Sequence, residues 1–257
     1  MAIDRSFLKA DIWEQWPLLE TDQKKGVPPP PVQKPYPSDA HLIELTPPHA
    51  LTVGQMPLIE AIRRRRSRRE FTPKPLSQEE LAFLVWATQG VSRTGPGPGD
   101  LLWRGLALLR TVPSGGARHT FETYLLVRRV TGLEPGLYRY LPIEHALYLT
   151  RPAAEVTPQA AALWEDRRFL MDSAVVFVWT TIPYRMEWRY GAIAPKLIAL
   201  DAGHVCQNLY LAAEAIGAGT CAVAAYNQKG VDALIGVDGE EEFAIYLAPV
   251  GKVGAQS

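Results

Sequence analysis

The chain has 257 residues, of which 47% are hydrophobic and 21% are charged, so its composition is that of a folded globular protein. Its 27 basic and 27 acidic residues balance, which argues against nucleic acid or an anionic membrane as a partner. The longest apolar stretch, Ala174–Ile182, is too short to span a bilayer, and the N-terminus lacks a signal-peptide pattern, so we expect a soluble, cytoplasmic protein.

Proline is concentrated in the N-terminal part of the chain, where residues 27–48 read VPPPPVQKPYPSDAHLIELTPP. Dense proline blocks helix formation and favours extended backbone. We therefore predict an extended, proline-rich arm over residues 1–52 and a folded domain over residues 53–257. The arm is either a loose leader or a strap laid over another subunit, and the alternation in HLIEL favours the strap.

Two helices are predicted next. Pro57 suits the first position of a short helix that ends in arginines. Ser77 and Glu80 form a capping-box pattern ahead of the apolar run LAFLVWATQ, which predicts a second helix ending at Gly90. The glycine- and proline-rich stretch Ser92–Asp100 is predicted to be a flexible loop.

The second half of the chain alternates strands with helices. Pro195–Ile216 is apolar almost all round, which predicts a helix buried in the body or in a subunit interface. Further elements are predicted as strands at Phe121–Arg128, at Gly136–Leu141, from Ala174, at Thr220–Tyr226 and up to Gly251, with a short helix at Val231–Ile235.

Asp201, His204 and Asn208 form a polar stripe on the predicted central helix, because they recur at spacings of three and four. A hydrogen-bonded structural role is the favoured interpretation, and contact with a cofactor or partner is the alternative. We expect no metal site, because a third strong ligand is missing and Cys206 and Cys221 lack ligand spacing.

An arginine-rich run extends from Arg63 to Arg69, in which Ser67 is the one residue that is not arginine. Guanidinium groups bind phosphate oxygens in a bidentate way, and a serine hydroxyl adds a donor, so the run predicts a phosphate site. The alternative is that the arginines stay solvated and complement the negative end of the preceding helix.

A short glycine turn precedes the strand predicted at Phe121, and it consists of Pro113, Ser114, Gly115, Gly116 and Ala117. Backbone without side chains can approach a flat ligand there and offer N–H groups, although such a stretch is also an ordinary turn. No P-loop or convincing GxGxxG pattern occurs, so we do not expect a Rossmann nucleotide site.

Taken in order, five segments resemble the nitroreductase-like flavoprotein superfamily, and within it the SagB-type dehydrogenase branch: RRSRREFTPKPLSQEELAFLVWATQGV, PSGGARHTFETYLLV, PGLYRY, DAGHVCQNLYLAAEAIGAG and APVGK. The resemblance extends from about Ile43 onward. It implies an α+β sandwich in which a mainly antiparallel sheet is flanked by helices. It also implies an intertwined homodimer with FMN at the subunit interface.

The resemblance also implies the residues that hold the cofactor. In that family an Arg-x-Ser-x-Arg/Lys element binds the FMN phosphate and ribityl chain, which here corresponds to Arg65, Arg66, Ser67 and Arg69. The turn along the flavin falls on Pro113, Ser114, Gly115, Gly116 and Ala117, and the strand at the ring edge on Ala222, Val223, Ala224 and Ala225. Relatives often carry glycine or a Gly/Glu pair in place of the two alanines that end this strand. Lys252 would complete the phosphate site.

Azole-forming members of the SagB-type branch use a Lys-Tyr pair ahead of the central helix to dehydrogenate a thiazoline or oxazoline. The corresponding residues here are Arg189 and Tyr190. Arginine stays protonated and cannot act as a base, so Tyr190 is the catalytic candidate, as a proton donor. Its alternative role is that of an ordinary core or interface tyrosine.

We therefore expect an FMN-dependent oxidoreductase of the nitroreductase type, which transfers two electrons through flavin to or from a small flat organic substrate. NAD(P)H is the expected reductant, a small molecule the acceptor, and a homodimer the assembly. The alternatives are a SagB-type dehydrogenase that oxidises a peptide azoline and returns electrons to oxygen, and a flavin-free binding protein on the same fold. Candidates for the substrate wall are Ser92–Asp100 with Trp103, and Trp179–Trp188.

Overall fold

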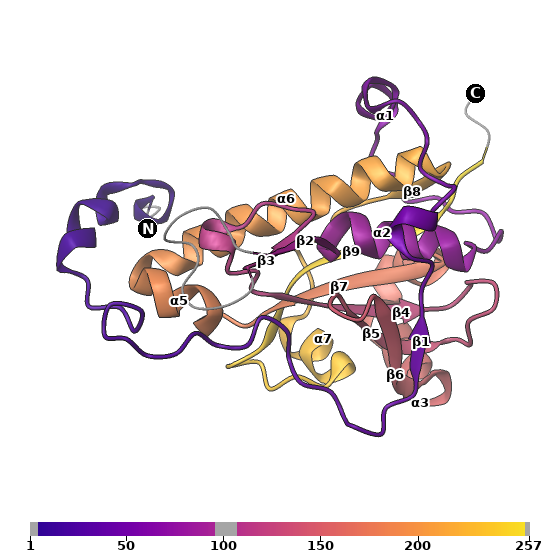
Figure 1. The fold of residues 1–257 in the computed structure, drawn as a ribbon. Helices are drawn as coiled ribbons and strands as arrows, with labels where there is room; N and C mark the ends of the chain where they lie inside the picture. Colours follow the sequence, from indigo (N-terminus) through magenta and orange to yellow (C-terminus); the bar gives the residue numbers. More distant parts are fainter. Residues whose placement is uncertain (1–4, 96–106, 255–257) are drawn as a thin grey trace.

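A computed structural model of the protein describes residues 5–95 and 107–254. Its centre is a seven-stranded sheet with the order β1-β6-β5-β4-β7-β9-β8 (Figure 1), and its strand pairs are antiparallel. The strands of this sheet are β1 (Leu42–Glu44), β4 (Phe121–Val127), β5 (Gly136–Leu141), β6 (Ala146–Pro152), β7 (Val175–Thr181), β8 (Ala218–Thr220) and β9 (Phe243–Lys252). A separate hairpin joins β2 (Val91–Gly95) to β3 (Ala107–Arg110).

Helices cover both faces of the sheet, so the chain has the expected α+β sandwich. The helices are α1 (Leu58–Arg64), α2 (Gln78–Gln89), α3 (Ala153–Leu163), α4 (Arg168–Asp172), α5 (Tyr184–Tyr190), α6 (Ala194–Ala215) and α7 (Gln228–Ile235). Strand residues alternate between two cores: Phe177 faces α2 and α6, whereas Val176 and Val178 face α3, α4 and α7. Within the described residues, no helix combines the length and apolarity needed to cross a membrane.

Several predicted elements are confirmed. The capping box forms at the start of α2, where the Glu80 amide donates to Ser77 Oγ (3.0 Å) and the Ser77 amide donates to Glu80 Oε2 (2.9 Å). The long apolar helix is α6, which packs in the core against α2 and the sheet. These elements are set by neighbours close in sequence, which is why their patterns were sufficient.

Two local predictions are wrong. The first part of Ser92–Asp100 belongs to strand β2, paired with β3; the rest of this stretch, and Trp103, lie outside the described residues. The strand predicted at Thr220–Tyr226 ends at Thr220, and beyond it only Val223 forms a bridge, to Leu247. The chain leaves the ladder because the Ala222 amide donates to the hydroxyl of Tyr210 (2.9 Å) instead of to a strand.

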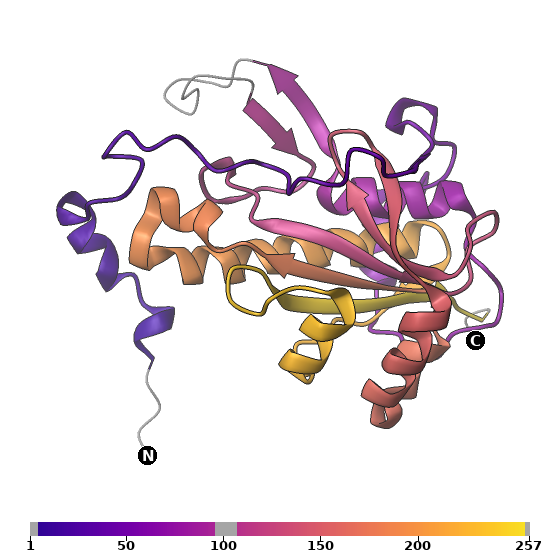
Figure 2. The same cartoon turned by 90° about the horizontal axis from the view of Figure 1, so that it is seen from below.

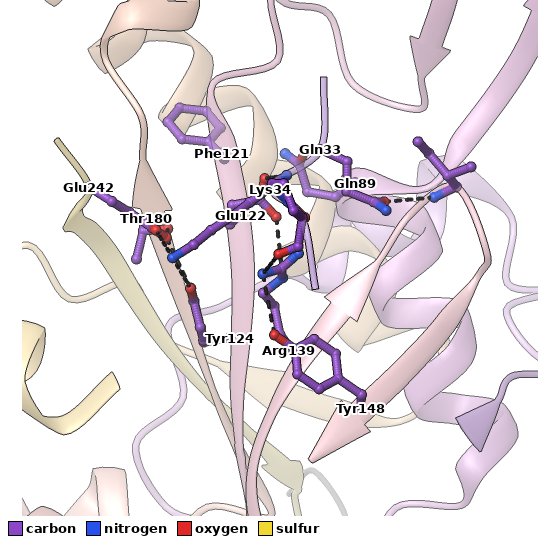
Figure 3. A network of polar contacts seen from close by, with 12 residues as sticks. Gln33, Lys34, Gln89, Phe121, Glu122, Tyr124, Arg139, Tyr148, Thr180 and Glu242 are labelled. Atoms are coloured by element: carbon purple, nitrogen blue, oxygen red, sulfur yellow. Dashed lines mark hydrogen bonds and ion pairs between the residues drawn. The ribbon is translucent and has the colours of Figure 1, made fainter. Parts of the chain in front are cut away.

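The proline-rich arm lies on the sheet of its own chain (Figures 2 and 3), whereas the sequence left open a loose leader or a strap over another subunit. Proline has no N–H group, so the arm is held largely through its carbonyls. Arg110 donates to the carbonyl of Val32 (2.8 Å), and Arg139 donates to that of Pro35 (3.0 Å). Further along, β1 pairs with β6.

Candidate functional site

The arginine loop, Arg63–Arg69, begins in the last turn of α1 and runs beside the end of β8. The Arg68 amide donates to the carbonyl of Thr220 (2.9 Å), and Ser67 forms a parallel bridge to the same residue. The guanidinium of Arg65 lies over the ring of Tyr210, 5.4 Å from its centre. The loop is therefore held at the C-terminal end of α6.

Tyr210 connects the arginine loop to the segment after β8. Its hydroxyl accepts a hydrogen bond from the Ala222 amide (2.9 Å) and lies 3.0 Å from Ser67 Oγ. Because Ala222 donates to the tyrosine oxygen, the tyrosine proton is available to Ser67, and the Ser67 proton can then point to a ligand. Sequence reasoning missed Tyr210; the signal was a polar ring in a nearly all-apolar helix, whose hydroxyl needs a partner.

Two buried polar atoms beside Ser67 lack partners within the described part of the chain. They are Nε of Arg68 and Oγ1 of Thr220, and Thr220 is fully buried. Buried donors without partners are rare and costly, so their presence here indicates a missing acceptor. A phosphate group, with several acceptor oxygens and negative charge, fits this donor set. Arg68 belongs to the predicted run but was not among the residues that the resemblance assigned to the cofactor, and Thr220 was not predicted at the site.

The other arginines of the loop differ in their partners. Arg63 pairs with Glu60 (2.5 Å), and Arg64 with Glu214 (3.4 Å). Arg66 donates to backbone carbonyls of its own loop. Within the described chain, the guanidinium of Arg65 has no ion pair or hydrogen bond, and neither does that of the exposed Arg69. Arg65 and Arg69 are therefore available to an anion, together with Ser67.

Lys252 is part of a buried polar cluster. Its ammonium contacts the carboxylate of Glu80 and donates to the carbonyl of Ile216 (2.6 Å). Glu80 also closes the capping box of α2. The structure thus ties Lys252 to two helix ends, and a phosphate would have to compete with Glu80 for its charge.

The glycine turn packs against the opposite part of α6. The Gly115 amide donates to the carboxylate of Asp201 (3.2 Å to Oδ2), and the His119 amide donates to Ser114 Oγ (2.9 Å). Burial raises the pKa of Asp201, against the hydrogen bonds from Ser114 and Gly115. Gly116 has φ of +57°, which glycine adopts without strain.

The polar stripe of α6 has largely structural contacts. Asn208 donates to the carbonyl of Ala87 in α2 (2.8 Å), and Asp201 holds the glycine turn. His204 is about half exposed, with Nδ1 4.0 Å from Asp201. The described residues contain no group of three or more side chains suited to a metal ion.

Within one chain, the glycine turn and the arginine loop lie on opposite flanks of α6. Asp201 contacts the turn and Tyr210 contacts the loop. The nine positions between them amount to about 13.5 Å along the axis and, at about 100° per residue, to a half-turn in direction. The two predicted groups of cofactor residues are therefore not brought together by a single chain.

A ridge of residues four apart runs from Tyr210 through Cys206, Ala202 and Ile198 over about 18 Å, turning around α6 by about 40° at each step. Cys206, Ala202 and Ile198 are buried in the core. A bulge in β9 opposite Trp179 and Thr180 lets Ile245 and Tyr246 both face this side of the sheet.

The predicted ring-edge segment lies near the Tyr210 end of this ridge. Ala222 is half-buried and Val223 is buried, whereas Ala224 and Ala225 are exposed. At the other end of the ridge, Ile198 lines a pocket of about 590 Å³. The arginine loop and this cavity therefore lie at opposite ends of α6.

Tyr190 lies against the N-terminal segment and the glycine turn. Its ring is 6.0 Å from that of Trp13 and 5.6 Å from that of Trp16, both in a 3-10 helix η2 (Asp11–Leu18). Its hydroxyl is so close to Gly116 that a Cβ built there would lie 2.7 Å away. Tyr190 is therefore placed beside the glycine turn.

The tryptophans proposed for a substrate wall in Trp179–Trp188 are core residues instead. Trp179 and Trp188 are 1% and 2% exposed, and Trp188 Nε1 donates to the carbonyl of Val27 (2.9 Å). Cys206 and Cys221 are also buried, and burial raises the pKa of the Cys206 thiol to about 12. A thiol held neutral in this way is not a nucleophile.

Comparison with known proteins gives a consistent result. A family model described as "Nitroreductase family" matches residues 62–252. A protein assigned to the nitroreductases in Methanocaldococcus jannaschii is 31% identical over 204 residues, covering 77% of this chain and 95% of that protein. A solved structure with the same assignment, from Ralstonia eutropha, superposes with a TM-score of 0.66 at 25% identity, covering 89% of this chain and 100% of that one.

A chain of the E. coli microcin synthetase McbBCD complex, solved with truncated pro-MccB17 bound, superposes with a TM-score of 0.59. It is 19% identical, and the superposition covers 99% of this chain and 85% of that one. At this identity the likeness concerns the fold alone.

Proposed function

The chain belongs to the nitroreductase family, and from this membership we propose that it is an FMN-dependent oxidoreductase transferring electrons in pairs to or from a small flat organic substrate. The observation that supports FMN most directly is the set of unpartnered donors in the arginine loop. Nε of Arg68 and Oγ1 of Thr220 are buried without partners beside the hydroxyl of Ser67. A terminal phosphate would satisfy all three.

In this proposal the arginine loop binds the phosphate. Arg65 and Arg69 supply free guanidinium groups, Arg66 adds charge at the rim, and Ser67 donates through the hydroxyl that Tyr210 orients. Lys252 would add positive charge only where the phosphate competes with Glu80 for its ammonium. The flavin, when bound, supplies the two-electron redox chemistry, so the protein needs no carboxylate pair or metal for that step.

The remaining predicted residues would contact the ring. The segment Ala222–Ala225 begins at the residue whose amide donates to the Tyr210 hydroxyl. Its last two residues are exposed and can approach a flat ligand. The glycine turn, Pro113–Ala117, would approach the ring from the other flank of α6, where its Gly115 amide is already bound to Asp201. Tyr190 is the candidate proton donor beside that turn.

Within one chain, the glycine turn and the arginine loop lie on opposite flanks of α6. We propose a homodimer in which the glycine turn of each copy completes the site at the arginine loop of the other. Three large apolar residues of α1 are exposed: Leu58 at 63%, Ile59 at 63% and Ile62 at 58%. An apolar groove of about 450 Å³ lies beside them, lined by α1, α2 and α6. Exposed apolar surface of this kind is typical of subunit interfaces, and twofold symmetry would use it twice.

NAD(P)H is the proposed reductant, with a small-molecule acceptor. A SagB-type dehydrogenase acting on a peptide azoline is the second candidate, favoured by the position of Tyr190 beside the glycine turn and opposed by Arg189, which cannot act as a base. Anaerobic titration separates them: NAD(P)H should bleach the flavin of a reductase rapidly. A dehydrogenase would keep its colour until an azoline substrate is added.

The test of FMN binding is the double substitution Arg65→Ala with Ser67→Ala. Charge-assisted hydrogen bonds contribute about 1.5 to 3 kcal/mol each, so FMN affinity should fall by more than about a hundredfold. The control is Arg63→Ala, whose guanidinium is engaged by Glu60. Flavin absorbance measures occupancy and circular dichroism measures folding. A folded double variant with full flavin content, or a wild-type protein that refuses added FMN, would refute the proposal.

A further inference from the structure

A pocket of about 590 Å³ lies at the Ile198 end of the ridge on α6, between α5 and the start of β9. Figure 2 shows the loop ahead of β9 extending toward this region. Its apolar walls include Ile198, Phe243 and Ile245, and Tyr184 of α5 adds an aromatic ring. The volume and the lining are those of a site for a small organic molecule.

The charge of the pocket is entirely negative among the described residues that line it. Glu187, Glu240 and Glu241 contribute carboxylates, and no basic side chain is among the lining residues. None of the three carboxylates forms an ion pair within the described chain. Desolvation and the negative charge of Glu241 together raise the pKa of Glu187. The pocket therefore lacks a counter-charge.

A buried polar atom also lacks a partner at this pocket. Thr181, the last residue of β7, lines it and is fully buried, yet its Oγ1 has no hydrogen-bond partner in the described structure. A buried hydroxyl without a partner costs about 1 to 3 kcal/mol of stability. This atom is independent of the glutamates, and it indicates that a polar group of a ligand completes the site.

We propose that this pocket binds an organic cation, such as an amine or amidine carried on a flat or apolar body. The body would pack against Phe243 and Ile245, and the cationic group would lie near Glu187 and Glu241. An organic cation is favoured over a metal ion because the walls are apolar and the described residues contain no metal-binding group. Anionic NAD(P)H is disfavoured here by like charge.

This inference rests on the proposed function only where it names a substrate: an organic cation in this pocket would be the substrate or acceptor of the flavin reaction. The pocket lies about 18 Å along α6 from Tyr210, toward the end of the helix that holds the glycine turn through Asp201. Binding of the cation itself does not depend on flavin.

The experiment is isothermal titration of the full-length protein with three probes of similar shape: benzamidine, benzyl alcohol and benzoate. We expect measurable binding of benzamidine, weaker binding of benzyl alcohol and none of benzoate. Benzamidine binding should weaken as salt is raised, because ionic screening reduces the attraction of the glutamates. Equal binding of benzoate and benzamidine would overturn the inference, as would no binding of any probe.

Variants locate the effect. The double substitution Glu187→Gln with Glu241→Gln should weaken benzamidine binding at least about fivefold, since each partly solvated ion pair contributes modestly. Thr181→Val should weaken it severalfold without loss of stability, because the hydroxyl has no partner in the protein. Glu165→Gln, at an exposed residue outside the pocket, is the control. Unchanged binding in both pocket variants would contradict the assignment.

Flavin content, measured by absorbance in the same samples, separates the two proposals. A colourless protein that binds benzamidine through Glu187 and Glu241 would retain the cation site and refute the flavoenzyme. A yellow protein without preference for benzamidine would support the flavoenzyme and refute the cation site.

Discussion

The ammonium of Lys34 lies 2.5 Å from the carboxylate of Glu242, which joins the N-terminal arm to the start of β9 (Figure 3). The other oxygen of Glu242 accepts hydrogen bonds from Tyr124 (3.1 Å) and Thr180 (2.6 Å). Burial and the charge of Glu242 raise the pKa of Tyr124, so its hydroxyl stays a donor. The arm is thus held by a buried carboxylate that requires a cation.

Replacing Lys34 with methionine should leave Glu242 buried without its cation. Breaking a buried pair is strongly destabilising, and Lys34 is partly exposed, so we expect the free energy of unfolding to fall by about 1 to 3 kcal/mol. Urea denaturation measures this, and limited proteolysis should cut the arm faster. Lys9→Met breaks an exposed ion pair with Asp11 and is the control. Equal stability of the two variants would contradict the prediction.

Tyr210→Phe removes the hydroxyl that contacts Ser67 and keeps the ring that packs against Arg65, so it tests the hydroxyl alone. The ring remains beneath Arg65, but the Ala222 amide and Ser67 lose their partner, so stability should fall by about 1 to 2 kcal/mol. FMN affinity should fall as well, by fluorescence titration. Tyr226→Phe removes one hydrogen bond, to the Ala244 carbonyl, away from the loop. If both variants bind FMN equally well, the hydroxyl of Tyr210 does not orient the site.

The buried, neutral state of His119 should make the free energy of unfolding fall as the pH is lowered. Burial, together with Arg110, Arg118 and Arg185, lowers the pKa of His119 to about 3 from its usual 6.5. Its neutral form is retained in the folded state, whereas the unfolded chain takes up a proton below about pH 6.5. This residue alone should therefore remove about 3 kcal/mol of stability between pH 7 and pH 4.

The check is His119→Asn, since asparagine tolerates the φ of +46° found here. Urea denaturation at both pH values gives the pH-dependent loss for each protein, and the loss should be smaller in the variant. An identical loss in the two proteins would show that His119 does not cause the loss of stability in acid.

Gly116→Ala should disturb the glycine turn in two ways. Alanine at φ of +57° is strained by about 1 to 2 kcal/mol, and its Cβ would lie 2.7 Å from the Tyr190 hydroxyl. Gly236→Ala is the control for backbone strain, because that glycine has φ of +79° and no neighbour within 4 Å. Denaturation should show a larger loss at position 116, partly restored by Tyr190→Phe. Without that restoration, the two residues are not in contact.

Patterns that depend on neighbours in sequence were predictable. Ser77 and Glu80 lie three residues apart and cap the same helix, and the apolar character of α6 required burial whatever surrounded it. The phosphate site at the arginine loop stays a prediction, which rests on the preference of guanidinium groups for anions. The arm was predicted to be extended over residues 1–52, whereas Ser6–Leu8, Asp11–Leu18 and Pro48–Ala50 are short 3-10 helices. Its position was not predictable, because it depends on Arg110, Arg139 and Glu242 from distant parts of the chain.

The sequence by itself determined the capped helix, because its signals lie within a few residues of one another, and its family resemblance implied the fold class. Tertiary structure alone decided that Tyr210 orients Ser67, that Arg68 and Thr220 leave buried donors, and that Glu187 and Glu241 share a pocket. Those groups lie far apart along the chain, and only the packing of α6 against the sheet fixes the distances between them.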